Sequence, residues 1–393
     1  MNGPPAAVPV VVGYAEARCT VRSGRTVHDL AGEVFAKLLD NCGITNREVD
    51  GFAVCQSLAE AGNPFWSATV SEYLGLELDW CQVVDLGGSS FCAAVARACD
   101  AIRTGACTTV VVLAADAPTG GDRSQVRLWR PEWQDPVGLM GPPGAFGLLS
   151  SAYQARHGLD RRALGRLAVT LRGHALLNDN ACEKLRKPLS LEDYMASPMI
   201  SDPVCLLDCV MRCDGANAVL VTTERRAAEL GLRRRVRPAG YGERSHYGAT
   251  DPVSDMTTTG HRIAAERALA QAGMAISDID MLQAYDDFLI AVMLQMEQIG
   301  FCPEGGGCDF LLGTDVSHTG DLPVNTGGGQ MSAGQPGLAG SGLGFVEAIR
   351  QLFGEGGGRQ VPDAGNAMVS GLGWIPYGRN WSVSNVMILE RDQ

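Results

Sequence analysis

Residues 81–114 read CQVVDLGGSSFCAAVARACDAIRTGACTTVVVLA, and this stretch decides the fold. Cys81–Leu86 is an apolar strand pattern, and the glycine-serine turn at residues 87–90 opens a helix from about Phe91 to Thr104. Thr108–Ala114 follows as a continuous apolar run, which is typical of a strand buried on both faces. A strand, a helix and a second apolar strand in this order predict parallel pairing through a right-handed crossover.

The segments before this stretch continue the same alternation. Apolar residues at helical spacing follow Thr26, a candidate N-cap, and stop at Gly43. The predicted elements are a strand at Val8–Gly13, a helix between Thr26 and Gly43, a strand at Val49–Val54 and a helix near Pro64–Leu74. The sequence therefore predicts an α/β fold with a largely parallel sheet.

The alternation breaks between residues 117 and 200. This stretch is rich in Gly, Pro, Trp and Arg, with partial helices at Leu148–Arg156 and Arg162–Leu177. So long an irregular segment predicts an inserted loop domain, and such insertions often carry a site. Regular order resumes at Ala216–Thr222.

The second half of the chain repeats the first. Gly43 precedes Asp50 by seven residues, and Gly273 precedes Asp280 by the same spacing, each time between a helix and a strand. A glycine-rich turn, a helix and an apolar strand then recur at Gly87–Ala114 and Gly334–Gly371. We therefore predict an internal duplication into βαβαβ halves, each with a five-stranded, mainly parallel sheet. The expected boundaries are a first half at 1–116, an insertion at 117–200, completion of the first half at 201–230 and a second half at 231–393, which closes with a strand at 380–391.

Composition excludes several classes of protein. The chain has 393 residues, 46% hydrophobic and 19% charged, which indicates a globular protein with a sizeable core. The net charge of −12 argues against a nucleic-acid partner, because phosphate recognition needs a basic face. No apolar run is long enough for a membrane span. Residues 1–7 lack the basic region of a signal peptide, so we expect a cytoplasmic protein.

Thirteen cysteines raise the question of a metal site or disulfides. No C-x-x-C pair occurs, although Cys205, Cys209 and Cys213 repeat every four residues and could share one helical face. A structural zinc site would need a fourth ligand, and the nearest histidines are distant in sequence. We therefore predict reduced core thiols and no metal.

Three motifs resemble the thiolase superfamily over nearly the whole chain. Residues 203–209 with Asp214-Gly215-Ala216 are similar to the family segment before its mid-chain strand. Tyr285-Asp286-Asp287-Phe288 stands where thiolases carry an Asn-Glu-Ala-Phe box, or a His-Asp variant in the sterol carrier protein X branch. Residues 325–329 through Gly334-Gln335-Pro336 are similar to the block from Asn-x-x-Gly-Gly to Gly-His-Pro. The resemblance implies a thiolase-like fold with layers in the order α/β/α/β/α.

The departures from the family pattern bear on chemistry. Gly88 stands at the position of the nucleophilic Cys, and Gln335 stands at that of the activating His. Residues 369–373 lack the second Cys, which acts as acid and base in thiolases. Gly88, Gly371 and Gly373 remain as possible backbone N–H donors to a substrate oxygen. The resemblance therefore implies a CoA-thioester site without an acyl-cysteine.

The pattern is closest to the thiolase-like aldolases of bacterial steroid side-chain degradation. These also have glycine-rich sequence at the nucleophile position, followed by a Cys that Cys92 matches, a Tyr-Asp-x-Phe box and a Gly-Phe-Cys like residues 300–302. They cleave a β-hydroxyacyl-CoA by a retro-aldol reaction, which would make Tyr285 the base for the β-hydroxyl if nearby N–H donors lower its pKa. This chain departs from them at Gly334, where they have a second Tyr, and at Asp287, where they have His.

Each candidate catalytic residue also has a structural interpretation. Tyr285 could be a core tyrosine at a strand end, although the polar Asp286 and Asp287 follow at once. Ser89 is a nucleophile or a helix N-cap, and Cys92 is a displaced nucleophile or a core thiol.

The candidate binding residues also allow more than one role. Gln335, which cannot take up a proton near neutral pH, is expected to orient substrate or water. His318 either reaches the pocket from a loop or lies on the surface. Asn325 is either a turn former or a polar pocket group.

Three functions follow from the sequence. The leading hypothesis is an acyl-CoA carbon–carbon lyase acting by retro-aldol cleavage, with a steroid-like or other bulky acyl group, no bound cofactor and coenzyme A as part of the substrate. The alternatives are an acyltransferase with a displaced nucleophile and a non-catalytic subunit that binds CoA esters. The resemblance implies a small zinc-ribbon and OB-fold partner protein. It also implies a homodimer formed through a strand of the first half. We expect this strand to be the apolar run Thr108–Ala114 and the interface to bury more than about 2,000 Å².

Overall fold

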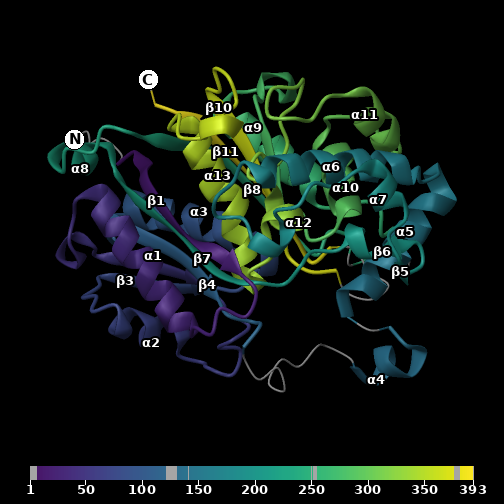
Figure 1. Ribbon diagram of the computed structural model, residues 1–393. Coiled ribbons are helices and arrows are strands. Elements are labelled where there is room, and N and C mark those ends of the chain that lie inside the picture. The colour runs from purple at the N-terminus through teal and green to yellow at the C-terminus, as the bar shows by residue number, and fades with distance from the viewer. Residues whose placement is uncertain are drawn as a thin grey trace.

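The computed structural model describes residues 7–120, 131–139, 141–248, 250, 255–375 and 381–392. Nine strands form one mixed sheet in the order β3-β2-β4-β7-β1-β8-β11-β10-β9, seen at the centre of Figure 1. The strands are β1 (Pro9–Thr20), β2 (Gly51–Cys55), β3 (Trp80–Val84), β4 (Thr109–Asp116), β7 (Asp214–Thr223), β8 (Val236–Ser245), β9 (Leu282–Ala284), β10 (Asn366–Leu372) and β11 (Val383–Arg391).

The first half contributes five strands. β3, β2 and β4 run parallel, whereas β7 pairs antiparallel with both β4 and β1. Four of the five strands, β1 to β4, thus run in the same direction, as expected for a mainly parallel half, and β7 is the exception, because it returns from the insertion in the opposite direction between β4 and β1. The two halves meet where β1 pairs with β8 at a single position, Val11 with Val236.

The second half repeats this strand order with one strand fewer. β9 and β10 are parallel, and β11 pairs antiparallel with β10 and β8, so β8, β9, β10 and β11 take the places of β1, β2, β4 and β7. In place of a fifth strand there is only an isolated bridge between Leu282 and Val324. Pro323 lacks the N–H that a longer ladder would use, and Asn325 turns the chain away with a φ of +46°. The duplication is visible in the strand order, whereas the four domain boundaries stay predictions.

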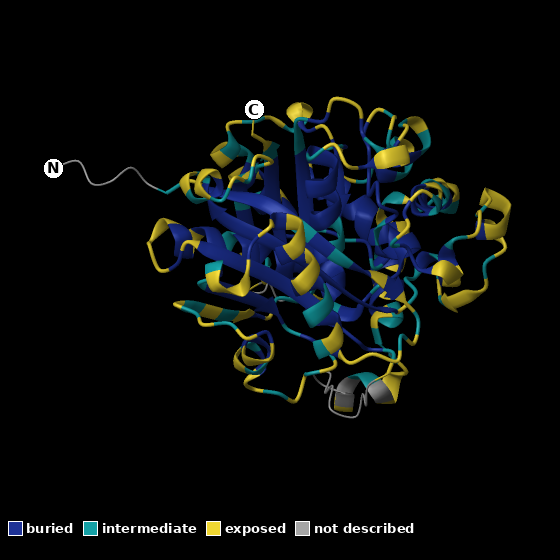
Figure 2. Ribbon diagram, turned by 60° about the vertical axis from the view of Figure 1, so that its left-hand side comes forward, coloured by how far each residue is buried: buried dark blue, intermediate teal, exposed yellow. Residues whose placement is uncertain are grey.

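Helices lie on both sides of each half-sheet. α1 (Val27–Cys42) and α2 (Trp66–Tyr73) cover the outer face of the first half, and α9 (His261–Ala272) and α10 (Leu289–Ile299) cover that of the second. Between the halves lie α3 (Ser90–Arg103) and α13 (Leu343–Leu352), where Phe91 and Phe345 pack with ring centroids 5.3 Å apart. This is the predicted α/β/α/β/α arrangement. Figure 2 shows most strands buried and most exposed residues on outer helices and loops, with the edge strand β3 partly exposed.

Local signals in the sequence set the helix ends. Thr26 accepts the N–H of Asp29, whose carboxylate accepts the N–H of Thr26 in return, so α1 begins with a capping box. Gly43 ends the same helix in the left-handed region at φ +64°. Both ends agree with the prediction.

The insertion is largely helical and packs on the second half. Its described elements are α4 (Pro131–Gln134), α5 (Gly141–His157), α6 (Arg161–Leu176), α7 (Leu191–Met195), β5 (Met199–Ser201) and β6 (Val204–Cys205). The ring of Phe146 on α5 stacks on Phe288 at 3.9 Å, directly after the Tyr-Asp-Asp motif. α6 packs against α10, α11 (Gly307–Gly313) and α12 (Gly329–Ala333). The insertion thus packs against the loops that hold the Tyr-Asp-Asp motif and stabilises them.

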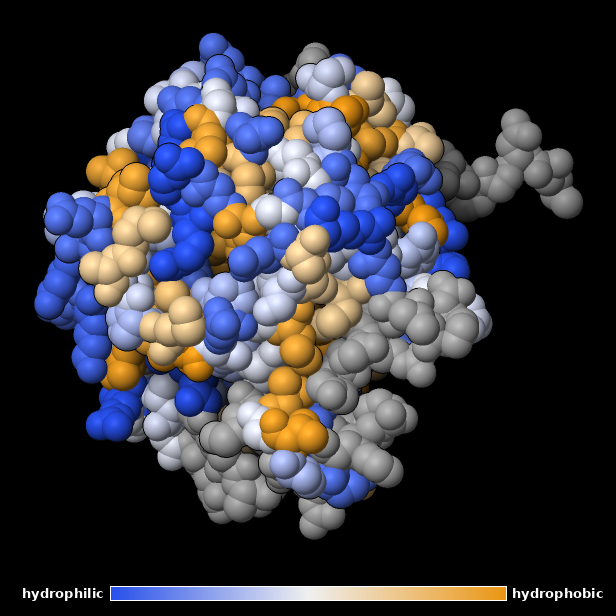
Figure 3. Space-filling view, turned by 90° about the vertical axis from the view of Figure 1, so that its right-hand side faces the viewer, coloured by the Kyte–Doolittle hydropathy of each residue, from blue (hydrophilic) through white to orange (hydrophobic). Residues whose placement is uncertain are grey.

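One face of the insertion exposes apolar side chains. Met199, Ile200 and Leu206 beside the small β5–β6 sheet are 60%, 50% and 50% exposed. The side of the molecule that carries the insertion is seen face-on in Figure 3, where hydrophobic groups alternate with polar ones. Among the described helices, none is long and apolar enough to cross a membrane.

The cysteines do not form the helical row that their spacing suggested. Cys205 ends β6, and Cys209 and Cys213 lie in an extended segment before β7, because residues 206–208 make only one turn of 3₁₀ helix. All thirteen cysteines are free thiols, as predicted, and most are buried.

The apolar run at 108–114 cannot offer a free edge to a second copy of the chain. It forms β4, whose two edges are both used, by β2 and by β7. The edge strand of this half is instead β3, on which Cys81 and Val83 are exposed.

Candidate active site

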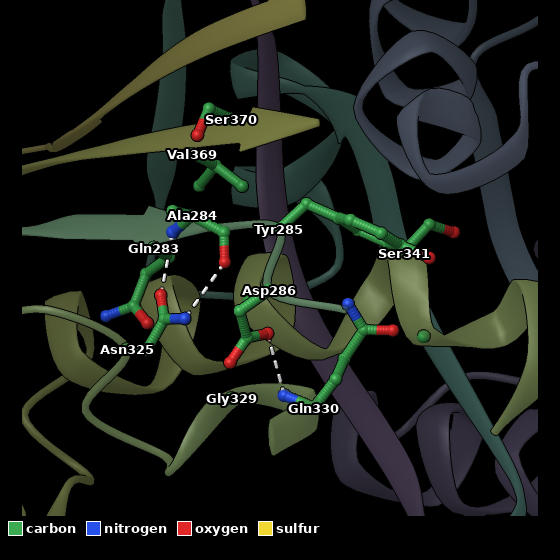
Figure 4. Close-up of a pocket in the computed structure, with 12 residues that line it drawn as sticks. Gln283, Ala284, Tyr285, Asp286, Asn325, Gly329, Gln330, Ser341, Val369 and Ser370 are labelled. Atoms are coloured by element: carbon green, nitrogen blue, oxygen red, sulfur yellow. Dashed lines mark hydrogen bonds between the residues drawn. The ribbon is translucent and has the colours of Figure 1, made fainter. Parts of the chain in front are cut away.

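The Tyr-Asp-Asp motif lies at the carboxyl end of β9. Tyr285 continues the parallel pairing of β9 with β10, because its N–H donates to the carbonyl of Ser370 at 3.0 Å. The side chain of Asn325 fixes the preceding residue: its oxygen accepts the N–H of Ala284 at 2.7 Å and its nitrogen donates to the carbonyl of Ala284 at 3.0 Å. Asn325 is thus engaged by the backbone and positions the motif (Figure 4).

The Tyr285 ring lies against Gly88. A Cβ at residue 88 would stand 2.3 Å from Cε2 and Cζ of that ring and 2.3 Å from the carbonyl oxygen of Leu372. Any side chain at residue 88, a cysteine included, would therefore collide with Tyr285. The phenol ring occupies the space of the side chain that residue 88 lacks.

Tyr285 is a protonated phenol at neutral pH. Burial raises its pKa above the usual 10, and the nearby carboxyl of Asp287 raises it further, while hydrogen bonding to Gln335 and Gln330 partly opposes the rise. The expected lowering of this pKa by N–H donors is wrong, because the residue sits among carboxyl groups in a poorly hydrated site. Tyr285 is therefore equipped to give a proton and not to take one.

Asp286 is buried and held by two backbone N–H groups. Its carboxylate accepts from Gln330 at 2.8 Å and from Met331 at 3.3 Å, at the start of α12. Gly329 allows this approach, because a Cβ there would stand 1.8 Å from the Asp286 carboxylate. Burial raises the pKa of Asp286 to about 7, against the effect of the two N–H donors. These contacts make Asp286 a clamp between the motif and α12.

Asp287 is the carboxyl group with a free oxygen. Its Oδ1 is buried and has no hydrogen-bond partner in the part of the chain that the structure describes. Burial, followed by the charge of Asp286, raises the pKa of Asp287 to about 8. A carboxyl group that titrates near the operating pH, beside a phenol, can serve as a general base.

Gln335 and Gly334 lie on the loop after α12, and the Gln335 side chain is within hydrogen-bonding reach of Tyr285. The backbone of Gln335 pairs with the segment before β7, donating to the carbonyl of Met211 at 2.8 Å and accepting from Cys213 at 2.7 Å. Gly334 has φ +106°, and a Cβ there would stand 2.6 Å from the Cys213 sulfur. A tyrosine at residue 334, as in the resembled aldolases, does not fit, because Cys213, Cys182 and Cys19 surround this position.

The glycine donors expected at residues 88, 371 and 373 are largely engaged. The N–H of Gly373 donates to Val383 at 2.8 Å, and that of Gly88 makes a long bond to the Gly373 carbonyl at 3.4 Å. Gly371 lies in β10, with its carbonyl 3.0 Å from Nε2 of His261. The expectation of free oxyanion donors is therefore wrong for Gly373 and weak for Gly88, because the ends of β10 and β11 pair with each other.

Neither candidate nucleophile has the surroundings of one. The Ser89 hydroxyl makes a long contact of 3.5 Å to the Val383 carbonyl and does not cap α3; Ser90 instead accepts the N–H of Leu86. Cys92 is 3% exposed in the core between the halves, and burial raises the pKa of its thiol, so a thiolate is disfavoured. The structure favours core packing for Cys92 and gives Ser89 no base.

Two buried histidines that the sequence analysis did not single out position this site. His174 on α6 has Nδ1 3.2 Å from the Asn325 carbonyl, and its Nε2 accepts the N–H of His318 at 3.0 Å. This pattern fixes a neutral ring protonated on Nδ1, and burial lowers its pKa to about 4. His318 is partly buried and contributes its backbone N–H to this contact. His261 holds Gly371 in the same way, and burial also lowers its pKa to about 4.

A small pocket lies between the Tyr-Asp-Asp motif, α12 and β10. It is lined by Gln283, Ala284, Tyr285, Asp286, Asn325, Gly329, Gln330, Gly340, Ser341, Gly344, Val369 and Ser370. Of the predicted site residues it contains Tyr285, Asp286 and Asn325. Gln330 was missed although it directly follows the glycines of the 325–329 motif, because the sequence does not show that its side chain enters the pocket. The described residues contain no cluster of His, Cys, Asp and Glu suited to a metal ion.

Comparison with known proteins places the chain. It is 30% identical over 365 residues to the 17-hydroxy-3-oxo-4-pregnene-20-carboxyl-CoA lyase of Mycobacterium tuberculosis, and the alignment covers 88% of this chain and 91% of that protein. The chain belongs to the thiolase superfamily. The thiolase C-terminal domain-like family matches residues 242–391.

Two further similar proteins support this family assignment. The steroid side-chain-cleaving aldolase of Thermomonospora curvata is 28% identical over 391 residues, covering 93% of this chain and 95% of that protein. A solved structure described as an Ltp2-ChsH2(DUF35) aldolase superimposes with a TM-score of 0.85 at 27% identity and covers 98% of both chains. Thiolase-superfamily enzymes that cleave CoA esters thus share the fold of this chain over almost its full length.

Proposed function

We propose that this protein is a carbon–carbon lyase that cleaves a β-hydroxyacyl-CoA with a bulky, steroid-like acyl group by a retro-aldol reaction. The observation that carries the proposal is the Tyr285 ring against Gly88, because it removes the place of an acyl-enzyme nucleophile and puts a proton-transfer group there. The names of the lyase and aldolase relatives support the same reaction class.

The residues of the site can be assigned to the steps of this reaction. Asp287, with its free oxygen and raised pKa, takes the proton of the β-hydroxyl. The Cα–Cβ bond breaks, the β-carbon becomes a carbonyl, and the electron pair moves onto the thioester as an enolate. Tyr285 then gives a proton to Cα, which releases a shortened acyl-CoA and a ketone or aldehyde.

The displaced-nucleophile acyltransferase is not proposed, because Cys92 is a buried core thiol and Ser89 has no base. The non-catalytic alternative is not proposed either, since Asp286 and Asp287 are carboxyl groups with raised pKa values beside a phenol. Such groups are costly to bury and are typical of active sites.

The test is incubation with CoA thioesters and analysis by mass spectrometry. The 17-hydroxy steroid CoA ester named for the Mycobacterium tuberculosis relative should yield a ketone and a shortened acyl-CoA without added CoA. Intact-protein mass should show no acyl adduct. CoA-dependent cleavage of a β-ketoacyl-CoA with a labelled acyl-enzyme would overturn the proposal.

We further infer that the enzyme works as a complex. The similar aldolase structure is described with a DUF35 protein, so we propose a small partner of that zinc-ribbon and OB-fold type. A homodimer is proposed through the free edge of β3, where Val83 is 40% exposed. Light scattering should give at least twice the 41.5 kDa of the chain, and co-expression with a DUF35 protein from the same genome should give co-purification.

A further inference from the structure

Gln330 is a buried side chain whose polar atoms lack well-formed hydrogen bonds. It is 1% exposed, and neither its carboxamide oxygen nor its nitrogen makes a hydrogen bond of good geometry among the described residues, although the carboxamide lies close enough to Tyr285 and Asp286 to lower the pKa of both groups. Leaving both atoms unpaired in a protein interior is costly, which makes such a residue an exception that calls for a reason. The cost is recovered if a bound molecule supplies the partner.

The carboxamide of Gln330 is directed into the pocket beneath Tyr285. In Figure 4 it lies between the Asp286 carboxyl and Ser341, and the ring of Tyr285 passes above it. Gly340 leaves the room for it, since a Cβ there would stand 2.0 Å from the Gln330 oxygen. At the other end, the backbone N–H of Gln330 is anchored on Asp286.

The other amide and hydroxyl donors of the pocket are already in use. Gln283 donates to the Thr326 hydroxyl, Asn325 to the Ala284 carbonyl, Ser341 to the Leu338 carbonyl and Ser370 to the Gln295 side chain, at 2.8–3.0 Å. Within the described lining this leaves Tyr285, which is assigned to proton transfer, and the Gln330 carboxamide. Gln330 is therefore the side chain free to donate to a substrate oxygen.

We propose that Gln330 is a catalytic residue whose Nε2–H donates to the thioester oxygen of the substrate and stabilises the enolate formed there. This rests on the proposed lyase function. The thioester oxygen is the atom onto which the electron pair of the broken Cα–Cβ bond moves, and a fixed neutral donor stabilises that charge most where water is excluded. The carboxamide neither gains nor loses a proton, so it complements the proton transfers of Asp287 and Tyr285.

The test compares Gln330→Met with Gln351→Met. Gln351 is a buried carboxamide whose atoms are all bonded, to Thr326, Glu347, Arg359 and Val361. Removing an unpaired polar group should leave the melting temperature of Gln330→Met unchanged or raised, whereas kcat falls by about 10²–10³-fold. Gln351→Met should do the reverse: a lower melting temperature with kcat largely kept.

A second readout isolates the enolate. In D₂O the wild-type enzyme should exchange the α-protons of the shortened acyl-CoA product, and Gln330→Met should lose that exchange in proportion to kcat. A variant with a lower melting temperature and unchanged kcat and exchange would make Gln330 merely structural and overturn the inference, while the lyase function stands. If the wild-type enzyme neither cleaves nor exchanges any CoA ester tested, the proposed function itself fails.

Discussion

Replacing Asp287 with Asn should stabilise the protein and inactivate it. The raised pKa of Asp287 means that ionisation of this partly buried carboxyl group opposes folding. The folded-state pKa of about 8 lies above the usual 3.8, so the folded state holds the proton more tightly and stability falls as pH rises between these two values. Asn keeps the shape and removes the charge, so its advantage should grow over that pH range.

The size of the effect has an upper bound. A shift of about four units at about 1.4 kcal/mol per unit gives a ceiling of about 6 kcal/mol above pH 8. Part of the shift is the repulsion from Asp286, and Asn itself leaves buried amide atoms to satisfy, which costs about 1–3 kcal/mol. We expect a net gain of about 1–3 kcal/mol at pH 8.5 and almost none at pH 5.

The assay combines melting curves at pH 5 and 8.5 with a pH–rate profile. Wild-type kcat should rise with pH with an apparent pKa near 8, as Asp287 ionises. In Asp287→Asn, kcat should fall by about 10²–10⁴-fold and should no longer show this pH dependence. Asp100→Asn, at a solvent-exposed helix position, serves as the control and should change neither quantity. Equal melting-temperature differences at both pH values, or wild-type turnover in Asp287→Asn, would refute the reasoning.

Three further substitutions test the steric and chemical argument. Tyr285→Phe should keep the fold and lower kcat by about 10²–10⁴-fold, since only the proton donor is lost; full lyase activity would rule out this role. Gly88→Cys should abolish cleavage without creating thiolase activity, because the new Cβ meets the Tyr285 ring, and overpacking should cost about 1–3 kcal/mol by denaturant titration. Cys92→Ala should lower the melting temperature by a few degrees while kcat and resistance to thiol alkylators persist; loss of turnover alone would restore the nucleophile hypothesis.

The parts of the fold that could be predicted from the sequence are those set by residues close together in the chain. The Thr26 capping box and the Gly43 stop involve neighbours within four residues, and both are seen. Strand direction was less accessible, because the antiparallel entry of β7 depends on how the insertion packs and not on any pattern inside Asp214–Thr223. The missing fifth strand of the second half was not predictable either, because the bond of the Leu282 N–H to the Pro323 carbonyl joins residues far apart in the sequence.

The candidate site shows the same division. The motif around Tyr285 could be found because chemistry-bearing residues are adjacent in sequence. His174 could not, since it acts on Asn325 from 151 residues away and resembles any histidine on a helix. The direction of the Tyr285 pKa was predicted wrongly for a related reason: burial and the Asp287 charge outweigh the donors, and burial is a property of the folded chain.

The loss of a nucleophile at Gly88 and the phenol of Tyr285 are one structural change and not two. A side chain at residue 88 and a ring at residue 285 cannot occupy the same space, so an acyl-enzyme site and a phenol site exclude each other on this scaffold. Once the ring is present, the chemistry must proceed without a covalent intermediate, and the carboxyl groups that follow Tyr285 become the available bases. Retro-aldol cleavage meets this condition, because it needs a base, an acid and an enolate donor but no acyl transfer to the enzyme.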